Sequence, residues 1–167
     1  MAYIEPCCCE RQLPKLLREK DVFFQTSGDV TIKHLMKSVA CMVDGRNVMW
    51  LVAPDVDVYL LHTIRHWFAR GWLAGLRLIT NVPRHAMVKE ILEGCPDVEY
   101  AGGGKVANGL LVFCGEKTAV AVQGDMLLEK DFAMRMYAGW FGQRDGEKFK
   151  ALLEPFAAKI RVAKKKA

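Results

Sequence analysis

Apolar residues recur along the chain in two patterns, one typical of buried strands and one typical of amphipathic helices. Nearly continuous apolar runs at 47–53 and 76–80 are typical of strands covered on both faces of a sheet. Between them, residues 57–72 carry apolar positions at helical spacing on one face and basic or histidine positions on the other. The order strand, helix, strand predicts a right-handed crossover between parallel strands.

Further elements flank this unit on both sides. Before it, we expect a charged helix at 10–20, a strand at 22–24 and a helix whose apolar spacing runs from 32 to 43. After it, a helix at 84–92 and a short strand at 97–100 are expected. This alternation predicts an α/β fold.

The pattern changes in the last third of the chain. Apolar runs at 110–114 and 118–122 are joined by a Gly-Glu-Lys turn, which indicates a hairpin and an antiparallel part of the sheet. A strand-like segment follows at 132–141, and a helix at 146–160 comes last. Pro155 lies inside that helix and predicts a kink or a break.

Length and composition bound the organisation of the protein. The chain has 167 residues, of which 51% are hydrophobic and 26% charged, the balance of one compact domain. We expect an N-terminal segment with a short helix at 1–20, a folded domain at 21–162 and a basic tail at 163–167. Because no leader pattern opens the sequence and the apolar runs are too short to cross a bilayer, we expect a cytoplasmic protein without a membrane partner.

Positive charge is concentrated at the C-terminal end. The net charge is +5, and the last seven residues supply four positive charges and no acid: Arg161, Lys164, Lys165 and Lys166. Such a cluster attracts the phosphates of nucleic acid without distinguishing sequences. A solubilising end to the chain is the alternative interpretation.

The order of elements is most distinctive around two junctions. A helix ends at Arg70-Gly71 before the strand at 76–79, and the hairpin at 109–122 is followed by Gln123-Gly124-Asp125-Met126. With these junctions, residues 21–162 resemble one half of a phospholipase D superfamily domain. The resemblance implies an α/β/α sandwich with a mixed, mostly parallel sheet of about seven strands flanked by helices. It also implies a homodimer, since active members of the family need two half-sites.

The active-site motif of that family is missing from the matching segment. Active members carry His-x-Lys-x4-Asp on the first hairpin strand, where the His attacks phosphorus. One alignment places Ala107, Gly109 and Cys114 at these positions, and a shift by one places Asn108, Leu110 and Gly115 there. Neither alignment restores the triad, so no catalytic residue is carried over and the sequence favours a non-catalytic protein.

A glycine-rich turn at 101–105 precedes the hairpin. The amides of Gly103 and Gly104 are able to approach an anion closely, and Lys105 would neutralise it. The spacing differs from that of a phosphate loop, because Val106 stands where Ser or Thr is needed. A flexible connection is the alternative interpretation.

Three histidines were compared with known catalytic or metal-binding patterns. His62 and His66 have the spacing of a zinc pair, but no Glu completes a metalloprotease motif, so a solvated helix face is favoured. His85 is the histidine that we consider as a substitute nucleophile, with Lys89 and Lys105 in a rearranged phosphodiesterase site.

The six cysteines lack the spacing of a metal site or of a disulfide framework. Three are consecutive, Cys7, Cys8 and Cys9, and three are scattered, Cys41, Cys95 and Cys114. No C-x-x-C pair occurs among them. We therefore expect no metal and no other cofactor, and reduced thiols in the N-terminal segment.

Three functions follow from these observations. The first, which we favour, is a non-catalytic phospholipase D-like module that binds nucleic acid. Its candidate anion-binding residues are Lys105, Gly103, Gly104, Asn108, Arg65, Arg70, Lys164, Lys165 and Lys166. The second is a homodimeric protein-interaction module without a ligand, and the third is a phosphodiesterase or nuclease with a rearranged active site.

Overall fold

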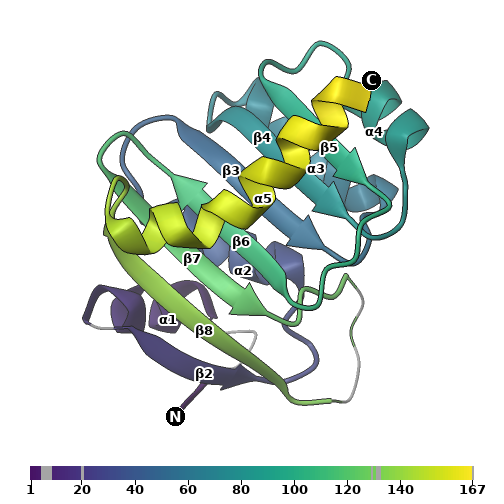
Figure 1. The fold of residues 1–167 in the computed structure, drawn as a ribbon. Coiled ribbons are helices and arrows are strands. Elements are labelled where there is room, and N and C mark those ends of the chain that lie inside the picture. The colour runs from purple at the N-terminus through teal and green to yellow at the C-terminus, as the bar shows by residue number, and fades with distance from the viewer. Residues whose placement is uncertain (5–8, 20, 129, 131–132, 167) are drawn as a thin grey trace.

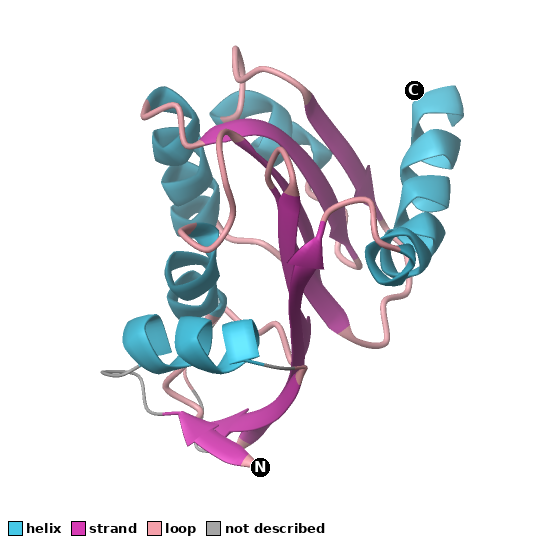
Figure 2. Cartoon of the chain, turned by 90° about the vertical axis from the view of Figure 1, so that its left-hand side faces the viewer, coloured by secondary structure: helices cyan, strands magenta, loops and turns pink. Residues whose placement is uncertain are grey.

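A mixed sheet separates two helical layers of unequal size (Figures 1 and 2). The computed structural model describes residues 1–4, 9–19, 21–128, 130 and 133–166. Over these residues the strands are β1 (Ala2–Ile4), β2 (Val22–Thr26), β3 (Asn47–Ala53), β4 (Leu73–Thr80), β5 (Val98–Gly102), β6 (Gly109–Cys114), β7 (Thr118–Gly124) and β8 (Arg135–Gln143). The helices are α1 (Cys9–Glu19), α2 (Ile32–Ala40), α3 (Val58–Ala69), α4 (His85–Ile91) and α5 (Glu147–Lys166).

The strand order corrects one part of the expected fold. The described strands form a single eight-stranded sheet in the order β1-β2-β8-β7-β6-β3-β4-β5. Three pairings are parallel and four are antiparallel. The α/β class and the mixed sheet are confirmed, whereas the expectation of a mostly parallel sheet of about seven strands is wrong. The additional strand β1 is only three residues long, too short for a period-two pattern to be recognised.

Two apolar cores lie on opposite faces of the sheet. The buried residues of α1, α2, α3 and α4 belong to the first core, and those of α5 belong to the second. Side chains of β3 enter both cores, Met49 and Leu51 the first and Val52 the second. The nearly continuous apolar run of this strand is explained by that double coverage, because successive strand residues point to opposite faces.

Helix α5 is longer than the sequence predicts. It continues through Pro155 to Lys166 and changes direction along its length (Figures 1 and 2). A proline removes one helical hydrogen bond and bends the backbone without necessarily ending the helix. Residues 163–166 therefore form the last turn of α5 instead of the expected tail at 163–167, of which residue 167 lies outside the described residues.

The carboxylate of Asp44 connects the turn after α2 to the β6–β7 hairpin. It accepts hydrogen bonds from the Thr118 hydroxyl at 2.6 Å, from the Thr118 amide at 2.9 Å and from the Lys117 amide at 3.1 Å. These bonds favour the ionised form and lower the pKa of Asp44 to about 2. The hairpin turn is thereby held to a segment more than 70 residues earlier in the sequence.

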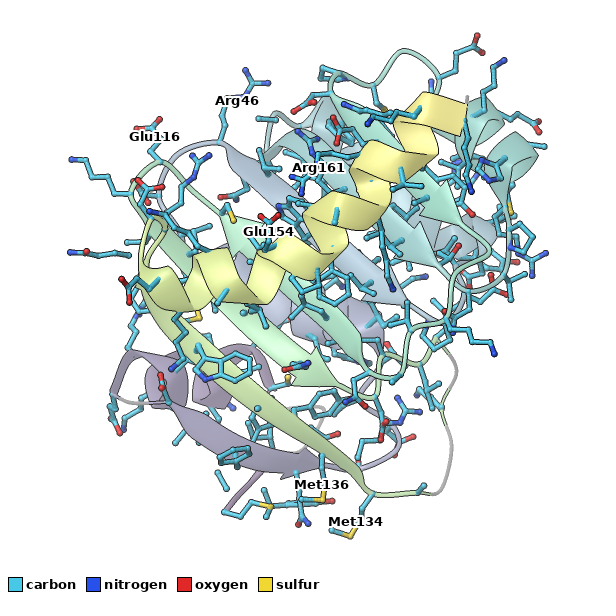
Figure 3. All side chains as sticks on the ribbon, viewed as in Figure 1. Arg46, Glu116, Met134, Met136, Glu154 and Arg161 are labelled. Carbon is cyan, nitrogen blue, oxygen red and sulfur yellow. The ribbon has the colours of Figure 1, made fainter. Side chains whose placement is uncertain are left out.

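We predict that Asp44→Asn lowers the stability of the protein at pH 7. We also predict that the difference in stability between the variant and the wild type becomes smaller in acid. The pKa of Asp44 is below its ordinary value of 3.8, so its stabilising effect is complete above that value and is lost as the pH falls towards about 2. Urea midpoints measured by circular dichroism at pH 7, 4 and 2.5 test this expectation. Glu116→Gln, which neutralises an exposed carboxylate at the same turn (Figure 3), is the control, and an equal loss in both variants would contradict the assignment.

Candidate functional site

The carboxyl ends of β3, β4 and β5 meet the first residue of β6 at one rim of the sheet. Ala53, Thr80 and Gly102 are register partners across the three parallel strands, and Val52 is paired with Leu110 of β6. We call this edge the carboxyl rim. The segment between β5 and β6 lies there, and it contains Gly103, Gly104, Lys105 and Asn108 from the sequence prediction.

The glycine turn is bound to the end of β4. The amides of Gly103 and Gly104 both donate to the carbonyl oxygen of Thr80, at 3.1 and 3.4 Å. The amide of Val106 donates to Oδ1 of Asn81 at 2.6 Å. The amides of Gly103 and Gly104 therefore have acceptors within the protein, and these bonds hold the turn to the end of β4. Lys105 and Asn108 are both exposed.

A groove of about 400 Å³ separates this turn from the C-terminal half of α5. It is lined by Gly102–Gly104, by the helix residues Lys159 and Lys166, and by aliphatic side chains of β4, β5 and α5. The ammonium of Lys159 donates to the carbonyl oxygen of Lys105 at 3.2 Å. We call this set of residues, with Lys105 beside it, the lysine groove. No acidic residue lines it within the described part of the chain.

Helical spacing explains why two of these lysines face the same groove. Lys159 and Lys166 are seven residues apart, which is about two turns of α5, so they project from the same side of the helix. Lys159 was not among the residues predicted from the sequence. Lys159 and Lys166 share one side of α5 only because the helix continues through residues 163–166, beyond the end predicted from the sequence.

The other two lysines of the C-terminal turn lie differently. The ammonium of Lys164 pairs with the carboxylate of Glu99, which also pairs with Arg77 at 3.0 Å. Its charge is therefore largely balanced within the protein. Lys165 is exposed and does not line the groove.

Arg65 and Arg70 do not join this surface. Both belong to the α3 segment, which packs on the opposite face of the sheet from α5. Arg65 donates to the carbonyl oxygen of Ile91 at 2.5 Å and so links α3 to α4, whereas Arg70 is the C-terminal capping residue of α3. The candidate anion-binding residues named from the sequence are therefore divided between two faces of the sheet.

A second polar cluster occupies the carboxyl rim and was missed from the sequence. Arg84 makes a two-point ion pair with Asp55, at 2.7 and 3.0 Å, and this pairing lowers the pKa of Asp55. The Tyr100 hydroxyl accepts from the Arg84 amide at 2.7 Å and bonds to the Thr80 hydroxyl at 2.9 Å. Because the Arg84 charge is balanced by Asp55, this cluster orders the rim without offering a free cation.

Among the described residues, no hydrogen bond or ring contact joins His62, His66 or His85 to one another. The ring of His85 lies edge-on to Tyr100 with 4.7 Å between centroids, and no described hydrogen bond or ring contact joins it to Lys89 or Lys105. His62 and His66 are exposed on α3. Over the described residues, no group of three His, Cys, Asp or Glu side chains is arranged to hold a metal ion.

Three of the described cysteines, Cys9, Cys95 and Cys114, lie where burial disfavours the thiolate, and Cys41 is exposed. Cys9 and Cys114 are buried, and Cys95 is half-buried. Desolvation raises the pKa of all three thiols and so disfavours the reactive thiolate. Cys7 and Cys8 lie outside the described residues.

The chain matches no known family model, and a search of curated proteins found none significantly similar to it. Within the described residues, no helix combines the length and apolar character needed to span a membrane. Function must therefore be inferred from the residues and contacts of the chain itself.

We predict that Tyr100→Phe lowers the free energy of unfolding by about 1 kcal/mol, because the Arg84 amide and the Thr80 hydroxyl each lose a hydrogen-bond partner. Urea denaturation of the variant and the wild type measures the difference. Tyr59→Phe is the matched control, since Tyr59 is 74% exposed on α3. An equal effect of the two changes would show that the Tyr100 hydroxyl does not stabilise the rim.

Proposed function

We propose that this chain is a non-catalytic phospholipase D-like module that binds the phosphate groups of nucleic acid in the lysine groove. The observation that carries the proposal is the convergence of Lys159 and Lys166 beside the loop of Lys105, with no acidic residue among the described residues of the lining. Cations that lack acidic partners and lie around a concave surface are suited to a polyanion.

Several features of the fold support the relation to phospholipase D. The helical layers enclose the sheet from both sides, and the crossover from β3 through α3 to β4 is parallel. The β6–β7 hairpin lies directly beside β3 and begins at the carboxyl rim. These are the junctions on which the sequence resemblance rests.

The space around Gly109 supports the absence of catalysis. In the first alignment, Gly109 stands where the family carries its lysine. A Cβ atom at this position would lie 2.1 Å from Cγ of Met126 and 3.0 Å from the carbonyl oxygen of Val52. Met126 is itself 1% exposed, so a lysine side chain would need the displacement of a buried neighbour.

The chemistry of the groove favours contact with phosphates over recognition of bases. Lysine ammonium groups act as mobile point charges, and phosphate contacts carry no sequence information. The apolar residues that line the groove are Ile79, Ala101, Ala158, Val162 and Ala163, none of which offers a ring for base stacking. We therefore expect binding that depends steeply on salt and weakly on sequence.

We predict that the pair Lys159→Gln and Lys166→Gln weakens oligonucleotide binding several-fold and lowers the slope of log K against log salt by about 2, one for each lost phosphate contact. Fluorescence anisotropy with labelled single- and double-stranded oligonucleotides at 50 and 200 mM salt measures both quantities. Point variants are preferable to truncation, because removal of residues 161–167 would also remove the last turns of α5.

The control is the pair Lys15→Gln and Lys37→Gln, which makes the same change in net charge on α1 and α2. These exposed lysines lie on the opposite face of the sheet. Equal weakening by both pairs would show a general effect of charge, and no binding at 50 mM salt would rule out the nucleic-acid function.

A second candidate function, homodimerisation, is favoured by an exposed apolar face. Register partners in adjacent strands point to the same face of a sheet. Tyr3 of β1 is paired with Gln25 of β2, and Gln25 is paired with Met136 of β8. Phe23 is two residues before Gln25, so Tyr3, Phe23 and Met136 lie on one face of β1, β2 and β8. The face is not covered by α5, and Met134 and Met136 lie together at one end of β8 (Figure 3). The exposed fractions are 50% for Tyr3, 70% for Phe23, 59% for Met134 and 53% for Met136.

A second copy of the chain is the occupant that we propose for this face. The exposed parts of Tyr3, Phe23, Met134 and Met136 offer on the order of 450 Å² of apolar surface, compared with about 800 Å² per partner in a standard interface. None of these side chains is charged, so the face is able to pack against its own copy about a two-fold axis without repulsion.

We predict that the pair Phe23→Glu and Met136→Glu converts a dimer to a monomer, because each copy would bring two carboxylates into an apolar contact. Sedimentation equilibrium at 10 to 200 µM protein measures the change. Tyr59→Glu places a carboxylate at an exposed aromatic position elsewhere and should leave the dimer intact. A wild-type chain that remains a monomer at the highest concentration would rule out this candidate.

A further inference from the structure

A cavity of about 620 Å³ lies in the layer of α1, α2 and α3, away from the lysine groove. It is bounded by the end of α2, by the turn that leads into β3 and by the turn that leads from α3 into β4. Its lining residues include Trp67, Trp72, Cys41, Val43 and Asn47. A volume in this range is typical of sites for small organic molecules.

Two tryptophans form one wall of the cavity. Trp67 is 6% exposed and packs on Phe113 with 6.0 Å between ring centroids, so it is held by the core. Trp72 lies edge-on to Trp67 at 5.9 Å and is 55% exposed. The Trp72 amide donates to the carbonyl oxygen of Trp67 at 3.0 Å, across a turn in which Gly71 has a φ of 72°. The indole of Trp72 is thus a supported aromatic surface with much of its area open.

Asn47 contributes an unsatisfied polar group to the same cavity. It is the first residue of β3, and its side chain points to the same side of the sheet as Met49 and Leu51, towards α2 and α3. The residue is 7% exposed, and its Oδ1 has no hydrogen-bond partner among the described residues. A buried amide oxygen without a partner is uncommon in proteins and requires an explanation.

A backbone hydrogen bond places Asn47 beside Trp72. The Asn47 backbone amide donates to the carbonyl oxygen of Trp72 at 3.4 Å, so the two residues are neighbours. Oδ1 itself is buried, and because the terminal torsion of an asparagine is soft, rotation of the side-chain amide would turn this oxygen towards a donor in the cavity. One aromatic face and one hydrogen-bond acceptor therefore converge on the same space.

The remaining charges define the class of ligand. Glu10 and Lys37 line the cavity with opposite signs, so its lining has no excess of either charge. An anion such as phosphate would find one lysine and one carboxylate instead of a cluster of cations. A flat and uncharged ring that carries an N–H donor is complementary to Trp72 and Asn47 together.

The geometry points to a binding site for an uncharged heteroaromatic lactam, with the ring stacked on Trp72 and its N–H donated to Oδ1 of Asn47. This site lies on the opposite face of the sheet from the lysine groove and at the opposite end of the parallel strands. It does not depend on the proposed nucleic-acid function, and it is tested with a different probe.

A pair of isosteric probes tests the inference on the full chain. Quinolin-2(1H)-one carries the lactam N–H, whereas coumarin has a ring oxygen at that position. Titrations followed by the indole N–H signals of a ¹⁵N-labelled protein should show saturable shifts of Trp72 and Trp67. The signals of Trp50 and Trp140, which pack on the side of α5, should remain unchanged. We expect quinolinone to bind at least ten-fold more tightly than coumarin.

Asn47→Leu keeps the approximate size of the side chain and removes the acceptor, so it should bind both rings with equal affinity. Trp72→Ala, a change at a largely exposed residue, should weaken both rings at least ten-fold and gives a second test if Asn47→Leu does not fold. The inference would be overturned if neither ring shifts the Trp72 signal saturably, or if coumarin binds the wild type as tightly as quinolinone. It would also be overturned if the preference persists in Asn47→Leu, or if Trp72→Ala leaves both affinities unchanged.

Discussion

The coverage of the central strands on one face of the sheet by a single helix is the constraint on which the rest of the structure depends. Strands β3, β6 and β7 carry apolar side chains on both faces, so the side away from α1–α4 also requires a cover. Helix α5 supplies it, with Phe149 near one end and Ile160 in the later turns. The bend of this helix allows both of its halves to follow a sheet that is itself twisted.

Both candidate functional surfaces depend on which strands α5 covers and which it leaves exposed. Where the last turns of α5 reach β4 and β5, Lys159 and Lys166 lie beside the glycine turn of the carboxyl rim and form the lysine groove. Where α5 does not reach, the outer sides of β1, β2 and β8 leave Phe23 and Met136 in contact with solvent. A cationic groove and an apolar face are therefore two consequences of placing one helix on a sheet of this width.

Two polar residues near the start of β3 differ in whether their side-chain oxygens have hydrogen-bond partners. Asp44 has its carboxylate fully engaged by Thr118 and Lys117, and so it fixes the hairpin. Asn47, three residues later, is buried with an oxygen that no described residue engages. A satisfied carboxylate stabilises the fold, whereas the buried and unsatisfied oxygen of Asn47 lies beside an open aromatic ring and supports the ligand site that we propose.

The sequence by itself determined the features that depend on local periodicity. The buried strands β3 and β4, the helices around them, the β6–β7 hairpin and the bend at Pro155 follow from spacing within short windows. The tertiary structure decided most of the strand pairing, because the antiparallel pairings β2–β8, β3–β6 and β7–β8 join segments whose contacts leave no periodic trace. It separated Arg65 and Arg70 from Lys105, joined Lys105 to Lys159, and brought Asn47 to Trp72. These relations depend on which face of the sheet each helix covers, and that choice is made by long-range packing that no local pattern encodes.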